Sequence, residues 1–214
     1  MIDYLIKLMP SMIEGLRVTI NLFALTLLFS LPLGMFIALG RLSKNKVISS
    51  SVQLYTWVMR GTPLMLQLVF VFFGLPLLGI AFDRYEAVLL AFVLNYAAYF
   101  GEIFRSGIQS IETGQHEAAK VLGYSPSKAF IRIILPQVVK RVLPPVANEF
   151  ITLVKDTSLV YVVGLGELLR AGKIAANRDA SLVPLIVVAL VYLILTAVLT
   201  KFFKYCEDKS SYYQ

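Results

Sequence analysis

Four long stretches without a charged residue constrain the fold of this chain more than any other feature of its sequence. They cover residues 18–40, 61–82, 87–101 and 180–200. A helix that crosses the hydrocarbon core of a bilayer needs about 20 predominantly apolar residues, and all but the third stretch reach that length. Hydrophobic residues make up 58% of the chain and charged residues 15%, against about 45–50% and about 25% in soluble domains. The sequence therefore predicts an all-α membrane protein that crosses the bilayer several times.

Five transmembrane helices fit the sequence, at about residues 18–40, 54–81, 86–106, 138–164 and 182–203. The fourth lies in an apolar interval that Glu149, Lys155 and Asp156 interrupt. The segment before the first helix lacks the basic region and the cleavage pattern of a signal peptide, so we expect that helix to be retained. The helices then form a single transmembrane domain over residues 1–214, which leaves no length for a separate catalytic or ATP-hydrolysing domain.

The distribution of basic residues predicts how the chain is oriented in the membrane. The connections at 41–53, 107–137 and 201–214, with their flanks, hold twelve lysines and arginines, and the opposite connections hold six. Because cytoplasmic loops carry an excess of these residues, we expect the C-terminus in the cytoplasm and the N-terminus outside. The net charge of +7 is then a consequence of topology and does not point to a nucleic-acid partner.

The residue types that build most cofactor sites are scarce. Cys206 is the only cysteine and His116 the only histidine, which excludes an internal disulfide, a cysteine-based metal cluster and a multi-histidine metal site. The chain also has no glycine-rich phosphate-binding loop. An integral membrane enzyme is therefore disfavoured, and we expect neither a catalytic site nor a cofactor or metal in this chain.

The connection between the third and fourth predicted helices has an unusual pattern. Residues 117–122 favour a helix, Gly123 can adopt the left-handed conformation that ends one, and Pro126 can begin another. The second piece, 127–135, is amphipathic, and Pro136 is expected to interrupt it. Two short helices joined by a tight bend would form a stiff projection at the membrane surface.

This segment resembles the EAA loop of ABC-importer permeases. The motif residues are Glu117, Ala118 and Ala119, then Gly123, then Ile133, Leu135 and Pro136, all at the family spacing. Residues 60–63 (Arg-Gly-Thr-Pro) and 155–159 (Lys-Asp-Thr-Ser-Leu) are similar to the polar amino-acid uptake branch of that family. The resemblance covers nearly the whole chain and implies a five-helix permease with a coupling helix between helices three and four.

The resemblance also implies how such a chain would act and with what. Glu117, Ala118, Ala119 and Gly123 would couple the membrane helices to a separate ABC ATPase subunit, two copies of which bind ATP and Mg. A second permease subunit, identical or different, and an extracytoplasmic substrate-binding protein would complete the complex. The chain is expected in a prokaryotic inner membrane.

Polar side chains within the predicted spans suggest where a solute would bind. A charged side chain near the centre of a span costs about 2.5–3.5 kcal/mol on insertion scales, so it tends to face a protein interior or a water-filled cavity. Two helices carry polar stripes at helical spacing, made of Asn95, Tyr99 and Glu102 on one and Glu149, Thr152 and Asp156 on the other. The candidate substrate-binding residues are Asp156, Asn95, Glu102, Glu149, Ser158 and Gln67. The alternative is that the acids and Lys155 form ion pairs that stabilise the bundle.

Three acids against one lysine within the spans favour a basic amino acid, arginine, lysine or histidine, moved by alternating access. An ABC permease for glutamine or another polar solute is the alternative. An ion-coupled secondary transporter could use the acids as proton or sodium sites, but it leaves the EAA segment unexplained and such proteins often contain inverted repeats, which this chain lacks.

Overall fold

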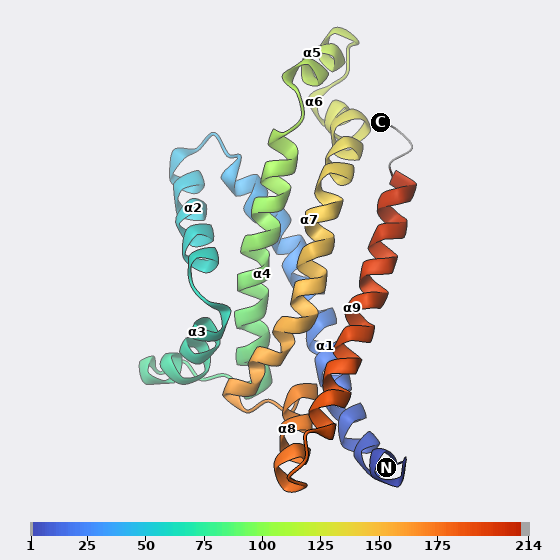
Figure 1. Cartoon of the computed structure of the whole chain (residues 1–214). Helices are drawn as coiled ribbons and strands as arrows, with labels where there is room; N and C mark the ends of the chain where they lie inside the picture. The colour runs from blue at the N-terminus through green and yellow to red at the C-terminus, as the bar shows by residue number, and fades with distance from the viewer. Residues whose placement is uncertain (1, 211–214) are drawn as a thin grey trace.

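The computed structural model describes residues 2–210, nearly all of which lie in helices, with no strand among them (Figure 1). Within this described part, three helices are long and apolar enough to cross a membrane: α1 (Ile2–Arg41), α4 (Arg84–Gln109) and α9 (Val183–Ser210). The predicted all-α class is confirmed. The expected short segment before the first span is instead the beginning of α1, which runs unbroken for 40 residues.

The centre of the bundle is the contact between α1 and α4, where two glycines let the backbones approach closely. A Cβ atom at Gly34 would lie 2.7 Å from Phe100 Cβ, and one at Gly101 would lie 2.4 Å from Ile37 Cγ2. Both distances are shorter than van der Waals contact, so no larger residue fits without a shift of the helices. Phe100 itself is fully buried at this crossing.

The second predicted helix is broken, and the prediction of one continuous helix over 54–81 is wrong. The structure has α2 (Lys46–Gly61), then α3 (Leu64–Val69), which continues as a π-helical turn and a 3-10 turn to Leu78. The two halves meet at 103°. Pro63 explains the break because its ring disfavours helical backbone at the preceding residue, and Thr62 is accordingly extended, with φ −118° and ψ 146°.

The fourth predicted span corresponds to α7 (Leu135–Asp156), which lies between α4 and α9 in Figure 1. Five charged residues keep α7 outside the class of strongly apolar helices: Lys140, Arg141, Glu149, Lys155 and Asp156. By length and hydropathy the described residues thus provide three spans, or four if the bent pair of α2 and α3 counts as one. The remaining predicted span is α7, whose polar residues face the cavity described below.

A helix that the sequence pattern did not reveal, α8 (Leu168–Arg178), packs against α1 and α9. Glu167 begins it: the buried carboxylate accepts hydrogen bonds of 2.6 Å from the backbone N–H groups of Leu169 and Arg170 and one of 3.1 Å from the Tyr192 hydroxyl. These bonds satisfy the free N–H groups of the first turn. Glu167 therefore ties α8 to α9.

The EAA segment forms α5 (Thr113–Val121) and α6 (Pro126–Ala129). Gly123 has φ +74°, so the predicted left-handed turn is confirmed. The predicted interruption at Pro136 is wrong: a π-helical turn leads directly into α7, and the Leu135 N–H bonds to the Phe130 carbonyl five residues back. A wider turn of this kind lets a helix continue past a proline, which cannot donate to the residue four positions before it.

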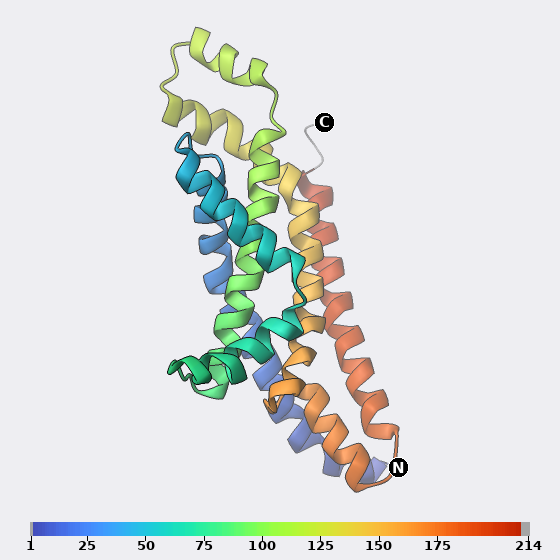
Figure 2. The same ribbon diagram turned by 90° about the vertical axis from the view of Figure 1, so that its left-hand side faces the viewer.

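The two ends of the molecule differ in what they carry. Figures 1 and 2 show α5 and α6 projecting at the end where α9 finishes, whereas α8 and the start of α1 lie at the opposite end. The beginning and the end of the described chain therefore lie at opposite ends of the bundle.

Candidate functional site

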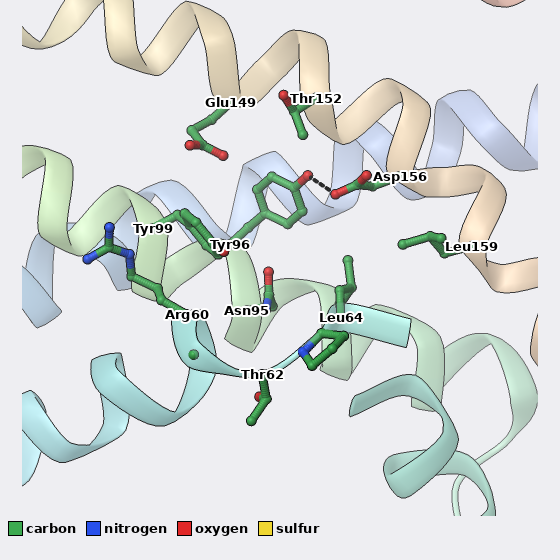
Figure 3. A pocket seen from close by; sticks show the side chains of 12 residues that line it. Arg60, Thr62, Leu64, Asn95, Tyr96, Tyr99, Glu149, Thr152, Asp156 and Leu159 are labelled. Atoms are coloured by element: carbon green, nitrogen blue, oxygen red, sulfur yellow. Dashed lines mark hydrogen bonds between the residues drawn. The ribbon is translucent and has the colours of Figure 1, made fainter. Parts of the chain in front are cut away.

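A cavity of about 480 Å³ lies where the break between α2 and α3 faces α4 and α7 (Figure 3). Residues 60–64 form one wall. The other walls are made by Asn95, Tyr96 and Tyr99 of α4, by Glu149, Thr152 and Asp156 of α7, and by Leu159. The polar stripes of α4 and α7 thus face each other across the cavity. The break between α2 and α3 places residues 60–64 at the same cavity.

Asp156 is held in place by Tyr96. The Tyr96 hydroxyl donates a hydrogen bond of 2.7 Å to Asp156 Oδ2, and the tyrosine ring is only 2% exposed. Phe92 stacks on that ring with the centroids 6.3 Å apart. A packed aromatic side chain thereby orients one oxygen of the carboxylate.

Asn95 and Gln67 fasten the broken helix to α4. The buried Asn95 amide donates hydrogen bonds of 3.0 Å to the Met59 carbonyl and to Gln67 Oε1. Gln67 in turn donates to the carbonyls of Met59 and Thr62 and to the Thr62 hydroxyl. These bonds satisfy carbonyls that the helix break leaves without helical partners. Gln67 does not line the cavity but positions Asn95, which does.

Glu149 and Asp156 are the two acids of the cavity. They stand seven residues apart on α7, about 10 Å along the helix axis, and Figure 3 shows both side chains directed toward the space between α7 and α4. Thr152 lies between them on the same face. Within residues 2–210 no group of three histidine, cysteine, aspartate or glutamate side chains could hold a metal ion.

Besides Gln67, two more of the six candidate substrate-binding residues lie outside the cavity. Glu102 forms an ion pair with Arg105, whose Nε donates to Glu102 Oε2 at 2.9 Å, and Ser158 donates its hydroxyl hydrogen to the Lys155 carbonyl at 2.7 Å. Neither lines the cavity, and the Lys155 side chain is exposed away from it. Ser158 follows Asp156 by two residues, in the 3-10 helix that begins at Thr157 after the end of α7, so the two side chains lie on different faces.

Sequence reasoning missed two residues of the site. The sequence pattern did not indicate Tyr96 as a site residue, because an aromatic residue in an apolar helix is typical of a packed core. Arg60 is part of the 60–63 segment but is not among the candidate site residues, yet its guanidinium carbon lies 5.3 Å from the centre of the Tyr99 ring, at the cavity wall. The proline three positions later was the available signal, since a break there exposes the end of α2 to the interior.

The projecting end carries an exposed apolar surface that sequence reasoning also missed. Val121 is 87% exposed and Leu122 is 72% exposed, directly before Gly123. Of the motif alanines, Ala118 is exposed, whereas Ala119 is 1% exposed and packs against the rest of the chain. The small side chain at Ala119 therefore lets α5 pack on its own chain, and the exposed apolar residues lie at the tip around Leu122.

Comparison with known proteins places this architecture in a family. Residues 30–211 match the family described as binding-protein-dependent transport system inner membrane component. The arginine transport system permease protein ArtQ of Bacillus subtilis is 41% identical over 202 residues, which are 94% of this chain and 92% of the relative. The putative glutamine transport system permease protein GlnP of Rickettsia conorii is 34% identical over 214 residues, 98% of each chain.

A solved structure agrees with the described helices. The crystal structure of an amino acid ABC transporter with histidines contains a chain that superposes on this one with a TM-score of 0.89. The two are 34% identical, and the match covers 96% of each. The likeness therefore extends over the bent helix, the projecting α5 and the cavity-forming helices together.

Proposed function

Since this chain belongs to the family of inner membrane components of binding-protein-dependent transport systems, we propose that it carries a basic amino acid across the membrane. The family and the relatives make it the permease subunit of an amino-acid ABC importer. The substrate class, arginine, lysine or histidine, is the finer proposal. It is supported above all by the cavity, which presents two carboxylates, Glu149 and Asp156, to a solute.

The physical argument for a cationic substrate is the free-energy cost of placing the carboxylates of Glu149 and Asp156 inside a membrane protein. A carboxylate inside a membrane protein needs a compensating charge or hydrogen bonds. Asp156 has the Tyr96 hydroxyl, while no ion pair to Glu149 or Asp156 exists within residues 2–210. A solute with an ammonium group and a cationic side chain would supply compensation for both acids. The cavity volume lies within the range of small-molecule sites.

Transport would require the partners that the family uses. We infer two ABC ATPase subunits, which bind ATP and Mg, a second permease subunit that is identical or different, and an extracytoplasmic substrate-binding protein. In this arrangement α7 and the bent pair of α2 and α3 complete five spans. The end that carries α5 faces the cytoplasm with the end of α9, and the start of α1 lies outside.

Coupling would pass through α5. Glu117, Ala118 and the exposed tip at Val121 and Leu122 would contact an ATPase, and Gly123 would provide the sharp exit. Movement of α5 would reach the cavity directly, because α6 and the π-helical turn run without interruption into α7, the helix that carries Glu149 and Asp156. Alternating access to the cavity is then driven by the ATPase and needs no catalytic residue of this chain.

A permease for glutamine is the second candidate. The similarity to a putative glutamine permease over 98% of the chain favours it, as does the Asn95 amide at the cavity wall. A neutral side chain, however, leaves one of the two acids without a cationic partner. The two candidates therefore predict different responses to removal of Glu149 or Asp156.

The test is substrate-stimulated ATP hydrolysis by the complete complex in lipid vesicles, with the binding protein loaded with arginine, histidine or glutamine. A basic amino acid is expected to raise the rate, and Glu149→Gln and Asp156→Asn are expected to abolish the rise. Glu207→Gln, which changes an acid near the end of α9, is the matched control and should respond like the wild type. Stimulation by glutamine alone, unaffected by Glu149→Gln, would replace the basic amino acid by glutamine as the substrate.

A further inference from the structure

A second cavity, of about 260 Å³, lies between α1 and α8, away from the site described above. Figures 1 and 2 show α8 (orange) beside the start of α1 (blue), at the end of the molecule opposite α5. The two helices are in close contact there, because a Cβ atom at Gly15 would lie 2.9 Å from Leu168 Cα. Four polar or charged side chains line the cavity: Ser11 and Glu14 of α1, and Arg170 and Arg178 of α8.

This cavity lies at the level where the hydrocarbon of a bilayer ends. The charge-free stretch of α1 begins at residue 18, and Glu14 precedes it by four residues, or about 6 Å along the helix. The charge-free stretch of α9 begins at residue 180, directly after α8. Polar headgroups occupy about 5–8 Å on each side of the hydrocarbon core, so the cavity is at their depth. Ile174, which also lines it, is 58% exposed and offers apolar surface to an acyl chain.

The cavity holds two opposite charges that do not pair with each other. Within residues 2–210 neither Arg170 nor Glu14 has an oppositely charged group at ion-pair distance. The Arg170 guanidinium group is half-buried and lies against Gly164, where a Cβ atom would be 3.3 Å from Nη1. Arg178, in contrast, donates two hydrogen bonds, of 2.6 and 2.8 Å, to the Asp179 carboxylate. A guanidinium group and a carboxylate are therefore available to one ligand.

A zwitterionic phospholipid headgroup complements these two charges. Phosphatidylethanolamine has a phosphate, for which a guanidinium group supplies paired N–H donors, and a primary ammonium group, which can donate to a carboxylate. We propose that the cavity binds one phosphatidylethanolamine molecule of the membrane, with its phosphate at Arg170 and its ammonium group at Glu14. This site does not depend on which solute the permease carries. The orientation proposed above places the lipid in the outer leaflet.

An acidic surface of the substrate-binding protein is the alternative occupant. Such a surface would satisfy Arg170, but it would bring a like charge toward Glu14, and like charges opposed across an interface are unfavourable. The carboxylate in the same cavity therefore favours a ligand that carries both signs of charge.

The experiment measures equilibrium binding of three phospholipids with identical acyl chains to the permease–ATPase complex in detergent, by native mass spectrometry. Phosphatidylethanolamine has both groups, phosphatidylcholine has a cation without N–H donors, and phosphatidylglycerol has no cation. The wild type should bind phosphatidylethanolamine roughly 10- to 100-fold more tightly than the other two, the range for a hydrogen bond to a charged group. Arg170→Gln should weaken binding of all three lipids, whereas Glu14→Gln should remove the preference and leave phosphatidylcholine binding unchanged.

Arg17→Gln is the matched control. Arg17 lies on α1 three residues after Glu14 but outside the cavity, so all three affinities should stay at the wild-type value. Water-soluble glycerophosphoethanolamine distinguishes a membrane lipid from a free phosphate ester, and it should bind far more weakly because it has no acyl chains to bury.

Three results would overturn the proposal. The first is the absence of a preference for phosphatidylethanolamine, or a preference that both Arg170→Gln and Glu14→Gln leave intact. The second is glycerophosphoethanolamine binding as tight as that of the lipid, which would make the ligand a soluble phosphate ester. The third is unchanged lipid binding by Arg170→Gln together with weaker association of the substrate-binding protein, which would assign the cavity to that protein.

Discussion

The Tyr96 hydroxyl and the Asp156 carboxylate, 60 residues apart in sequence, are joined by a hydrogen bond of 2.7 Å that links α4 to α7 inside the cavity. Tyr96 is buried among the aromatic side chains of α4. A ring that is fixed by packing holds the carboxylate at a fixed position, so the geometry of the cavity depends on the core of the bundle.

Tyr96→Phe should weaken substrate binding while the subunit still folds. The substitution keeps the ring and removes the donor to Asp156, and a hydrogen bond to a charged group contributes about 1.5–3 kcal/mol. We expect the affinity of the permease complex for its amino acid to fall by about tenfold or more, measured by equilibrium binding in nanodiscs. The control is Tyr85→Phe on the same helix, because the buried Tyr85 hydroxyl has no hydrogen-bond partner within residues 2–210. Equal affinities for wild type and Tyr96→Phe would contradict a positioning role.

Gly123→Ala should impair coupling. Gly123 has φ +74°, and a residue with a Cβ in this conformation is strained by roughly 1–2 kcal/mol, although no atom lies within 4 Å of the new methyl group. We expect α5 to be displaced and the substrate-stimulated ATPase rate to fall, and Gly123→Trp to abolish transport while the subunit still inserts. The control Gly114→Ala has equal space and an ordinary backbone conformation. ATP-driven uptake at the wild-type rate by Gly123→Trp would refute the coupling role.

Gly34→Ala should destabilise the contact between α1 and α4. The new methyl group would lie 2.7 Å from Phe100 Cβ and 3.1 Å from the Gly101 nitrogen, so the helices must move apart, and overpacking of this kind costs about 1–3 kcal/mol. A lower thermal midpoint of the purified subunit is the expected result. Gly40→Ala on the same helix meets only the Val52 side chain at 3.0 Å and should lower the midpoint less. Equal thermal midpoints for the two variants would show that the contact between α1 and α4 accommodates the added methyl group without loss of stability.

Asp179 should make the contact between α1 and the end of α8 sensitive to acid. Hydrogen bonds from Arg178 and from the Tyr4 hydroxyl lower the pKa of Asp179 to about 2 from its ordinary 3.8. Because the folded pKa is below the unfolded one, the stabilisation is present above about pH 4 and is lost as the pH falls through about 2.

The measurement for Asp179 is the thermal midpoint of wild type and Asp179→Asn between pH 2 and 7. Asp179→Asn should lower the midpoint at neutral pH by a constant amount down to about pH 4, and the difference should close toward pH 2. Glu207→Gln, at the opposite end of the molecule, should produce no such convergence. A difference that does not depend on pH would exclude this role for the carboxylate.

Local patterns predicted much of the fold because they act over a few residues. The apolar stretches predicted α1, α4 and α9. The glycine at position 123 predicted a left-handed turn, and the structure has one. Where two local effects competed, the prediction was wrong. Apolar composition favoured one helix over 54–81, yet Pro63 broke it, and Pro136 suggested a stop that a π-helical turn avoided.

The helix α8 shows a different reason for failure. It is short, and its basic residues are typical of a loop between two membrane spans. What holds it is distant in sequence: the buried Glu167 bonds to Tyr192 on α9, and the Leu168 N–H bonds to the Thr19 hydroxyl on α1, 149 residues away. The sequence pattern of residues 168–178 contains no information about these distant partners, so it could not predict the helix.

By itself the sequence determined that the chain lies in a membrane, that it is helical, and that it carries the EAA motif of a permease, because apolar length, helix propensity and motif spacing are properties of contiguous residues. Only the tertiary structure decided which polar residues share the cavity. In the structure Asn95, Glu149 and Asp156 line the cavity together with Arg60, whereas Glu102 lies outside it in an ion pair with Arg105. The physical reason is that the cavity exists only where three separate helices pack together, and their relative rotation is fixed by contacts between residues far apart in the chain.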